Sequence, residues 1–159
     1  MTEFSDPDSL RSRLVAIALQ WERMFGVAPQ ITGAISEYDA ACLVGHSDES
    51  FSADCVGRTA VSKGSDFAYH GVRYQVKANR PSGKPGSAVT KVAKASNYDW
   101  DKLIWLLYDR FYVLQEAWEW DVAEYRREFC EQVHVRPPDM RRGRRLVLPP
   151  TNLSSHPGV

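Results

Sequence analysis

A two-residue turn signal between two strand-like segments limits most strongly how this chain can fold. Residues 65–69 and 72–78 have strand character, and only His70 and Gly71 separate them. A connection of this kind joins antiparallel strands. In the second segment the residue types alternate, with Val72, Tyr74, Val76 and Ala78 on one face and Arg73, Gln75 and Lys77 on the other. The sequence therefore predicts a β-hairpin near the middle of the chain.

Two helical patterns precede the hairpin. Residues 9–25 have apolar side chains at steps of three and four, which predicts an amphipathic helix that ends before Gly26. Its apolar positions are Leu10, Leu14, Ile17, Ala18, Trp21 and Phe25. A second helix is predicted over residues 36–44, with a capping-box-like start at Ser36. Glu37 shares a face with small and apolar residues, so we expect it to point toward the body of the protein.

Strands and a helix are predicted after the hairpin. Residues 81–86 form a basic loop, and residues 89–95 are compatible with a short strand or helix. A buried strand at 102–109 and a second, aromatic-rich strand at 112–120 are followed by a helix at 121–130. We expect one α/β domain over residues 1–146, with a mixed sheet flanked by helices, and a loose tail over residues 147–159.

Composition places the chain among ordinary globular proteins. Of its 159 residues, 43% are hydrophobic and 25% are charged, and the mean hydropathy is −0.40. These values argue against a disordered chain and against a membrane protein. Three cysteines, at no disulfide-scaffold density, and a start without an apolar leader segment favour a cytoplasmic location.

Charge is segregated along the chain although the total is zero. The chain has 20 basic and 20 acidic residues, but residues 73–102 hold seven basic and two acidic ones. The last 27 residues hold five basic residues and one acidic residue. Such blocks can produce a positive face on a neutral protein, so a nucleic-acid partner is not excluded. We expect this face around Asp66 and Lys77.

The hairpin brings three chemically active side chains together. Gln75 and Lys77 are two residues apart on one strand, so they share a face. Asp66 lies at the start of the other strand, which the turn folds back beside them. One carboxylate, one amide and one ammonium group can therefore converge.

This Asp…Gln-x-Lys pattern resembles the PD-(D/E)xK nuclease superfamily. The resemblance implies a restriction-endonuclease-like fold and a metal-dependent endonuclease that hydrolyses DNA phosphodiester bonds, in restriction or repair. It assigns Asp66, Gln75 and Lys77 to the two strand elements and Glu37 to a helical acidic position. A homodimer is implied as well, and whether a partner subunit is needed stays open. Gln75 replaces the commoner acidic residue, so the alternative is a weakly active or inactive module that binds nucleic acid or assembles with a partner.

The residue types suit this chemistry. Mg²⁺, or Mn²⁺ in its place, prefers oxygen ligands and often binds through only one or two carboxylates. Asp66 and Glu37 would supply those carboxylates, and Gln75 would add an amide oxygen. Lys77 would orient an attacking water and offset charge in the transition state.

Basic residues after the motif are candidate nucleic-acid contacts. The first group starts within the second hairpin strand and comprises the basic residues Arg73, Arg80 and Lys84 with the polar Asn79. The second comprises Arg141, Arg142, Arg144 and Arg145. Arginine favours bidentate contacts to phosphate and guanine. The alternatives are a solvated charged loop or a turn role for Asn79 in the first group. For the second group the alternative is pairing with the acidic helix that holds Glu124, Glu128 and Glu131.

Overall fold

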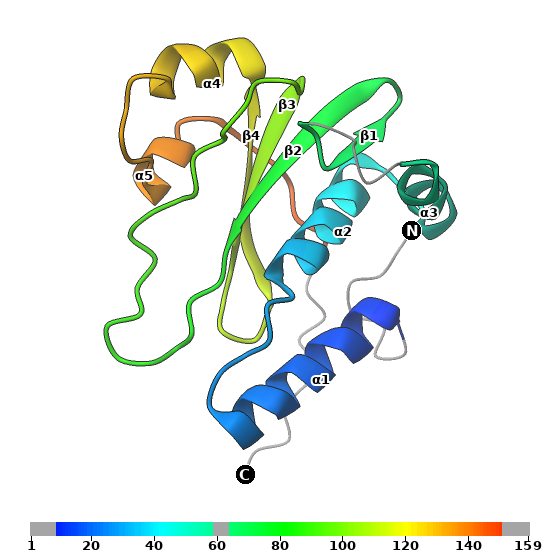
Figure 1. The fold of residues 1–159 in the computed structure, drawn as a ribbon, viewed down its shortest axis with the longest axis vertical. Coiled ribbons are helices and arrows are strands. Elements are labelled where there is room, and N and C mark those ends of the chain that lie inside the picture. The colour runs from blue at the N-terminus through cyan, green and yellow to red at the C-terminus, as the bar shows by residue number, and fades with distance from the viewer. Residues whose placement is uncertain (1–8, 59–63, 151–159) are drawn as a thin grey trace.

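The computed structural model describes residues 9–58 and 64–150, which form a mixed β-sheet flanked by helices (Figure 1). The helices are α1 (Leu10–Phe25), α2 (Thr32–Val44), α3 (Asp48–Gly57), α4 (Val122–Phe129) and α5 (Pro137–Met140). The strands are β1 (Phe67–Tyr69), β2 (Val72–Asn79), β3 (Lys102–Tyr108), β4 (Leu114–Asp121) and β5 (Arg144–Arg145). This arrangement confirms the prediction of a single α/β domain.

The sheet has the strand order β1-β2-β3-β4-β5, in which only β2 and β3 run parallel. The predicted hairpin is confirmed, with Phe67 opposite Tyr74. His70 and Gly71 both have positive φ, at 49° and 77°, as the right-handed twist of a two-residue hairpin requires. The short β1 leaves most of β2 near the edge of the sheet.

The strands β3 and β4 and the helix α4 lie within two residues of their predicted bounds. The start of the second helix was predicted wrongly. It begins at Thr32, four residues before Ser36, and the Ser36 hydroxyl donates to the carbonyl oxygen of Gly33 within the helix. The helices α3 and α5 were not predicted. A reciprocal cap between Ser47 and Ser50 starts α3, and it is the sequence signal that would have shown this helix.

Each face of the sheet has its own apolar core. The helix α2 covers the face formed by Tyr74, Val76, Ile104 and Leu106. The opposite face holds Leu103, Trp105 and Trp120 and is covered by α4 and the residues around α5; its core also includes Val92, Ala95, Trp100, Tyr125, Phe129, Val135 and Met140. Because β3 is buried on both sides, it reads as a continuous apolar run.

The helix α1 is oriented unexpectedly. An amphipathic helix normally turns its apolar face inward. In α1 the buried residues are Val15 and Ala18, whereas Leu10, Ile17 and Trp21 are exposed by 79%, 61% and 52%. Most of the apolar stripe that predicted the helix therefore lies on the outer surface, although Ala18 within it is buried.

A buried polar cluster attaches α1 to the rest of the domain. Arg11 donates from Nε to Asp39 Oδ1 at 2.6 Å and from Nη2 to Asp39 Oδ2 at 2.8 Å. The Tyr108 hydroxyl also donates to Asp39, at 2.7 Å, and Arg11 donates to the carbonyl oxygen of Tyr112. Asp39 on α2 has no exposed side-chain surface. Among the described residues, the groups that donate to its carboxylate come from α1 and β3.

The connection from β2 to the parallel strand β3 contains no helix. Residues 89–95 were predicted as a short strand or helix, but they contribute only a bridge between Val92 and Val135. The Lys94 ammonium donates to the carbonyl oxygens of Cys130 and Gln132. The crossover is thus bound to the segment between α4 and α5.

The chain after β5 stays attached up to Leu148. Leu146 donates its amide to the carbonyl oxygen of Ala117 at 2.8 Å, and Leu146 and Leu148 pack against the α2-side core. The predicted tail from residue 147 is therefore not loose at its start, and residues 151–159 lie outside the described residues. In the described part of the chain, no helix combines the length and the apolar character needed to cross a membrane.

Candidate functional site

The carboxylate of Asp66 lies at the edge of the sheet, just before β1. Its Oδ2 atom accepts a 2.7 Å hydrogen bond from the backbone amide of Val76 and a 2.8 Å bond from Gln75 Nε2. The Val76 amide would otherwise need a neighbouring strand as its partner, so Asp66 extends the hairpin pairing just before β1 begins. Burial raises the pKa of Asp66, while the Val76 amide and the charges of Lys77 and Arg58 act in the opposite direction.

Gln75 and Lys77 share a face of β2, as predicted. Their partners in the parallel register are Leu103 and Trp105, which belong to the core on the side away from α2. Gln75 is 9% exposed and contacts Asp66 through its amide nitrogen. Within the described ranges the Lys77 ammonium has no hydrogen-bond acceptor, but its charge lowers the pKa of Asp66. The structure thus groups Asp66, Gln75 and Lys77.

Glu37 reaches this group from the other side of the sheet edge, because its helix α2 packs against the Tyr74–Val76 face. The pKa of Glu37 is raised to about 7, mainly by burial and next by the negative charge of Asp66, while Arg58 opposes the rise. No hydrogen bond or ion pair joins Glu37 to another described residue. Glu37 is therefore a half-buried carboxyl group whose negative charge is repelled by that of Asp66.

Arg58 belongs to the site but was not predicted. It follows α3 and donates from Nη1 to the carbonyl oxygen of Ser65 at 2.8 Å and from Nε to Asp54 at 3.2 Å. Asp54 also accepts from the Ala68 amide, which fixes the end of α3 to β1. The positive charge of Arg58 lowers the pKa of both Glu37 and Asp66. Recognition of α3 in the sequence would have shown only that Arg58 follows a helix.

The donor set fits a magnesium ion held by few protein ligands. Two carboxylates from different elements repel each other, and the Glu37 oxygens and Asp66 Oδ1 have no donor among the described residues. A divalent cation prefers such oxygens and would relieve this repulsion. No group of three or more His, Cys, Asp or Glu residues suited to a metal occurs in the described part of the chain. Any ion here would thus depend on two carboxylates, with solvent or substrate oxygens as the remaining ligands.

Glu37 gives a pH prediction that can be tested without a substrate. Its pKa is about 7 in the folded protein and near its ordinary value of 4.5 in the unfolded chain. The folded state therefore binds the proton more tightly, so this group lowers stability as pH rises from about 4.5 to above 7. We expect Glu37→Gln to be stabilised relative to wild type at pH 8 and to gain much less at pH 5.

Urea unfolding at pH 5, 6, 7 and 8 in the presence of a chelator measures this difference. Glu131→Gln is the matched control, because Glu131 is exposed near the end of α4. Its stability should follow that of wild type at each pH. A constant difference between Glu37→Gln and wild type across the four pH values would contradict the raised pKa of Glu37.

The first group of predicted nucleic-acid contacts is largely engaged within the protein. Arg73 forms an exposed ion pair with Asp101, and the Lys84 ammonium donates to the carbonyl oxygen of Gly26. Asn79 bridges Trp105 Nε1 and the carbonyl oxygen of Lys91. The Arg80 side chain is only 7% exposed; it pairs with Glu22, donates to the Arg110 carbonyl and lies over the Tyr112 ring. Asn79 and Arg80 therefore have structural roles, and we do not retain them as nucleic-acid contacts.

Three of the four arginines after α5 form ion pairs. Arg141 binds Glu116 through two 2.8 Å hydrogen bonds, and Arg144 binds the buried Glu119 at 2.6 Å. Arg142 pairs with Glu128, and Arg145 lies over the Trp118 ring. Of the acidic helix considered as their partner, only Glu128 takes part, whereas Glu116 and Glu119 come from β4. The basic and acidic segments thus interleave, which weakens the prediction of a single positive face.

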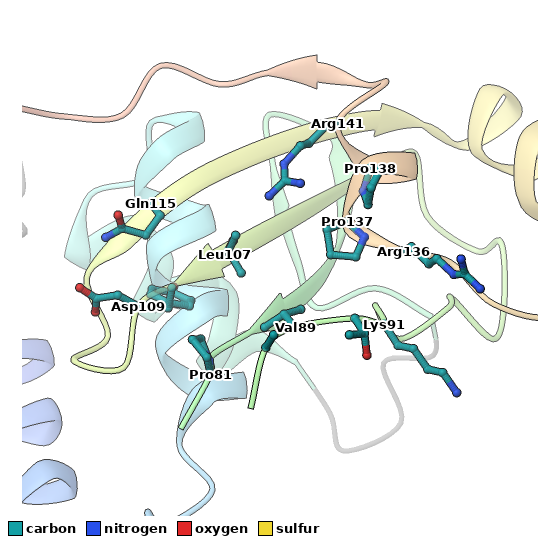
Figure 2. Close-up of a pocket in the computed structure, with 13 residues that line it drawn as sticks. Pro81, Val89, Lys91, Leu107, Asp109, Gln115, Arg136, Pro137, Pro138 and Arg141 are labelled. Atoms are coloured by element: carbon teal, nitrogen blue, oxygen red, sulfur yellow. The ribbon is translucent and has the colours of Figure 1, made fainter. Parts of the chain in front are cut away.

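A groove of about 770 Å³ lies on the face of the sheet away from α2 (Figure 2). Its walls are the crossover and the segment that leads into α5, and its floor includes Leu107 at the end of β3. Arg141 points into the groove, whereas Lys91 and Arg136 extend from one end of it. Asn79 links the groove to the site, because it lies two residues after Lys77 and holds Lys91.

The sequence was also compared with known proteins. It matches no protein-family model, and it matches no curated protein sequence. The functional interpretation therefore rests on the residues and the geometry described above.

Proposed function

We propose that this protein is a metal-dependent nuclease of the PD-(D/E)xK type, with a restriction-endonuclease-like arrangement, that hydrolyses DNA phosphodiester bonds. The observation that supports it best is the half-buried Asp66 carboxylate, which contacts Gln75 and is coupled by charge to Lys77 and Glu37. These are the residue types, in the order along the chain, that the sequence resemblance assigns to the reaction.

Each side chain has a distinct part in the proposed reaction. Asp66 and Glu37 would hold a Mg²⁺ or Mn²⁺ ion, which supplies Lewis-acid polarisation of a phosphoryl oxygen. Gln75 fixes the orientation of the Asp66 carboxylate through its 2.8 Å hydrogen bond. Lys77, which has no internal acceptor in the described residues, is available to a scissile phosphate or to the attacking water.

The groove offers a route for the substrate next to this site. Lys91 and Arg136 are exposed and form no ion pair with the described residues. Together with Lys77 they would provide phosphate contacts whose contribution to affinity falls as salt concentration rises.

A cleavage assay with Lys77→Met tests the proposal. We expect wild-type protein to cleave DNA in Mg²⁺ or Mn²⁺ and not in a chelator, with the rate in Lys77→Met reduced about a hundredfold. Supercoiled, linear and single-stranded DNA should be tested beside RNA. Arg127→Met, which removes an exposed cation from α4, is the matched control and should cleave like wild type.

Two results would contradict a nuclease. Equal cleavage by wild type and Lys77→Met would show that the activity does not come from this site. Absence of cleavage together with salt-sensitive DNA binding, weakened by substitutions among Arg141, Arg142, Arg144 and Arg145, would instead favour the inactive binding module.

A further inference from the structure

The outer face of α1 carries five large apolar side chains that the described residues leave exposed. Leu10, Ile17, Trp21, Met24 and Phe25 are exposed by 79%, 61%, 52%, 71% and 63%. The rings of Trp21 and Phe25 pack together, with centroids 4.6 Å apart. Clustered apolar side chains on an outer helix face indicate an interaction surface.

The spacing of these residues identifies a helix as the partner. Leu10, Leu14, Ile17, Trp21 and Met24 follow one another at steps of four, three, four and three. This is the heptad spacing that forms a seam between two helices, narrower than the stripe that buries a helix against a sheet. Leu14 belongs to this seam and is also partly buried against the α2-side core.

The exposed area is sufficient for a stable interface. The five fractional exposures add to slightly more than three complete side chains. At about 200 Å² for a large apolar side chain, they expose roughly 650 Å² of apolar surface per chain. The flanking Arg13 and Gln20 are also exposed and would enlarge the contact. A standard protein interface buries about 800 Å² per partner.

We propose that α1 pairs with α1 of a second copy of this chain, antiparallel across a two-fold axis near Ile17. In this arrangement Leu10 lies near the partner's Met24, and Leu14 lies near the partner's Trp21. Leu14 then meets a larger side chain, Leu10 meets one of similar size, and Ile17 meets its own copy. A two-fold interface needs a surface that complements itself, and this seam satisfies that requirement.

The charges beside the seam agree with self-association. Acidic Glu22 is turned inward and pairs with Arg80, so the exposed flanks hold only Arg13, Gln20 and Arg23. In antiparallel pairing Arg13 lies beside the partner's Gln20, which avoids a contact between like charges. Buried residues hold α1 to the domain on its other side, so the seam is available to a partner without unfolding.

Sedimentation of the full chain over a range of concentrations tests this dimer. We expect wild type to have a mass near twice 18.0 kDa and Ile17→Glu to dissociate about a hundredfold more readily. Val133→Glu is the matched control, since Val133 is 83% exposed and lies away from α1. Circular dichroism should show that both variants are folded, because both substituted residues are exposed.

Cysteine cross-linking then tests the orientation. In a chain with Cys42, Cys55 and Cys130 replaced by serine, a mixture of Leu10→Cys and Met24→Cys proteins should form a mixed disulfide dimer. Leu10→Cys alone should form little. A monomer at every concentration, or a dimer that Ile17→Glu leaves intact, would overturn the proposed interface. Cross-linking of Leu10→Cys to itself would overturn the antiparallel arrangement.

Discussion

Replacing Arg11 with methionine is expected to lower the free energy of unfolding by about 3–5 kcal/mol, because it leaves a buried charge without its partner. Asp39 has no exposed side-chain surface and accepts both hydrogen bonds of the Arg11 guanidinium. Burial raises the pKa of Asp39, and Arg11 and Tyr108 oppose that rise. Of the described donors to the Asp39 side chain, only the Tyr108 hydroxyl remains once Arg11 is replaced.

Urea unfolding of wild type, Arg11→Met and Arg13→Met measures this effect. Arg13 is exposed on the same helix, so its substitution should change stability by about 0.5 kcal/mol or less. The double variant Arg11→Met with Asp39→Asn should recover part of the loss, since the uncompensated charge is removed. If Arg11→Met costs no more than Arg13→Met, the cluster does not attach α1 to the domain.

Replacing Asp66 with asparagine is expected to reduce metal-dependent DNA cleavage by about a thousandfold, equivalent to about 4 kcal/mol of transition-state stabilisation. The substitution keeps the shape of the side chain and an oxygen that can accept from the Val76 amide. It removes the charge that would hold the cation, and with it the repulsion that adds to the effect of burial in raising the pKa of Glu37. The fold should therefore persist.

Two measurements separate loss of metal binding from loss of structure. Thermal unfolding without metal should occur at the same temperature as in wild type or higher, because a half-buried charge is removed. Mg²⁺ should raise the unfolding temperature of wild type and not that of Asp66→Asn. Glu131→Gln should behave like wild type in both assays. Cleavage by Asp66→Asn at the wild-type rate would contradict the proposed site.

The part of the fold that depends on local pattern could be predicted from the sequence. The β2 alternation, the turn at His70 and Gly71, and the apolar run of β3 each give a signal within a few residues. The helix α3 was not recognised in the sequence, because it buries no residue and its apolar and polar side chains do not lie on separate faces. Its start depends on hydrogen bonds between Ser47 and Ser50 rather than on periodicity.

The orientation of side chains depends on tertiary contacts and could not be predicted. The apolar residues of α1 predicted the helix correctly. In the structure Arg11 faces Asp39 in the domain, and most of these apolar residues are exposed. Likewise the sequence grouped Asp66, Gln75 and Lys77, which hairpin geometry brings together, but it did not place Arg58. Arginines close together in the sequence also differ in their contacts. Arg141 forms an ion pair with Glu116, whereas Arg145 lies over the Trp118 ring.

The connection between β2 and β3 has a consequence for how the chain can be divided. This segment forms no helix of its own, and its anchoring contacts include Val135 and the carbonyl oxygens of Cys130 and Gln132. A fragment that ended after β4 would contain every catalytic candidate yet lack these partners of the crossover. The central parallel strand pair would then be joined by a loop that has lost these contacts. The smallest useful unit for expression therefore extends at least through Val135.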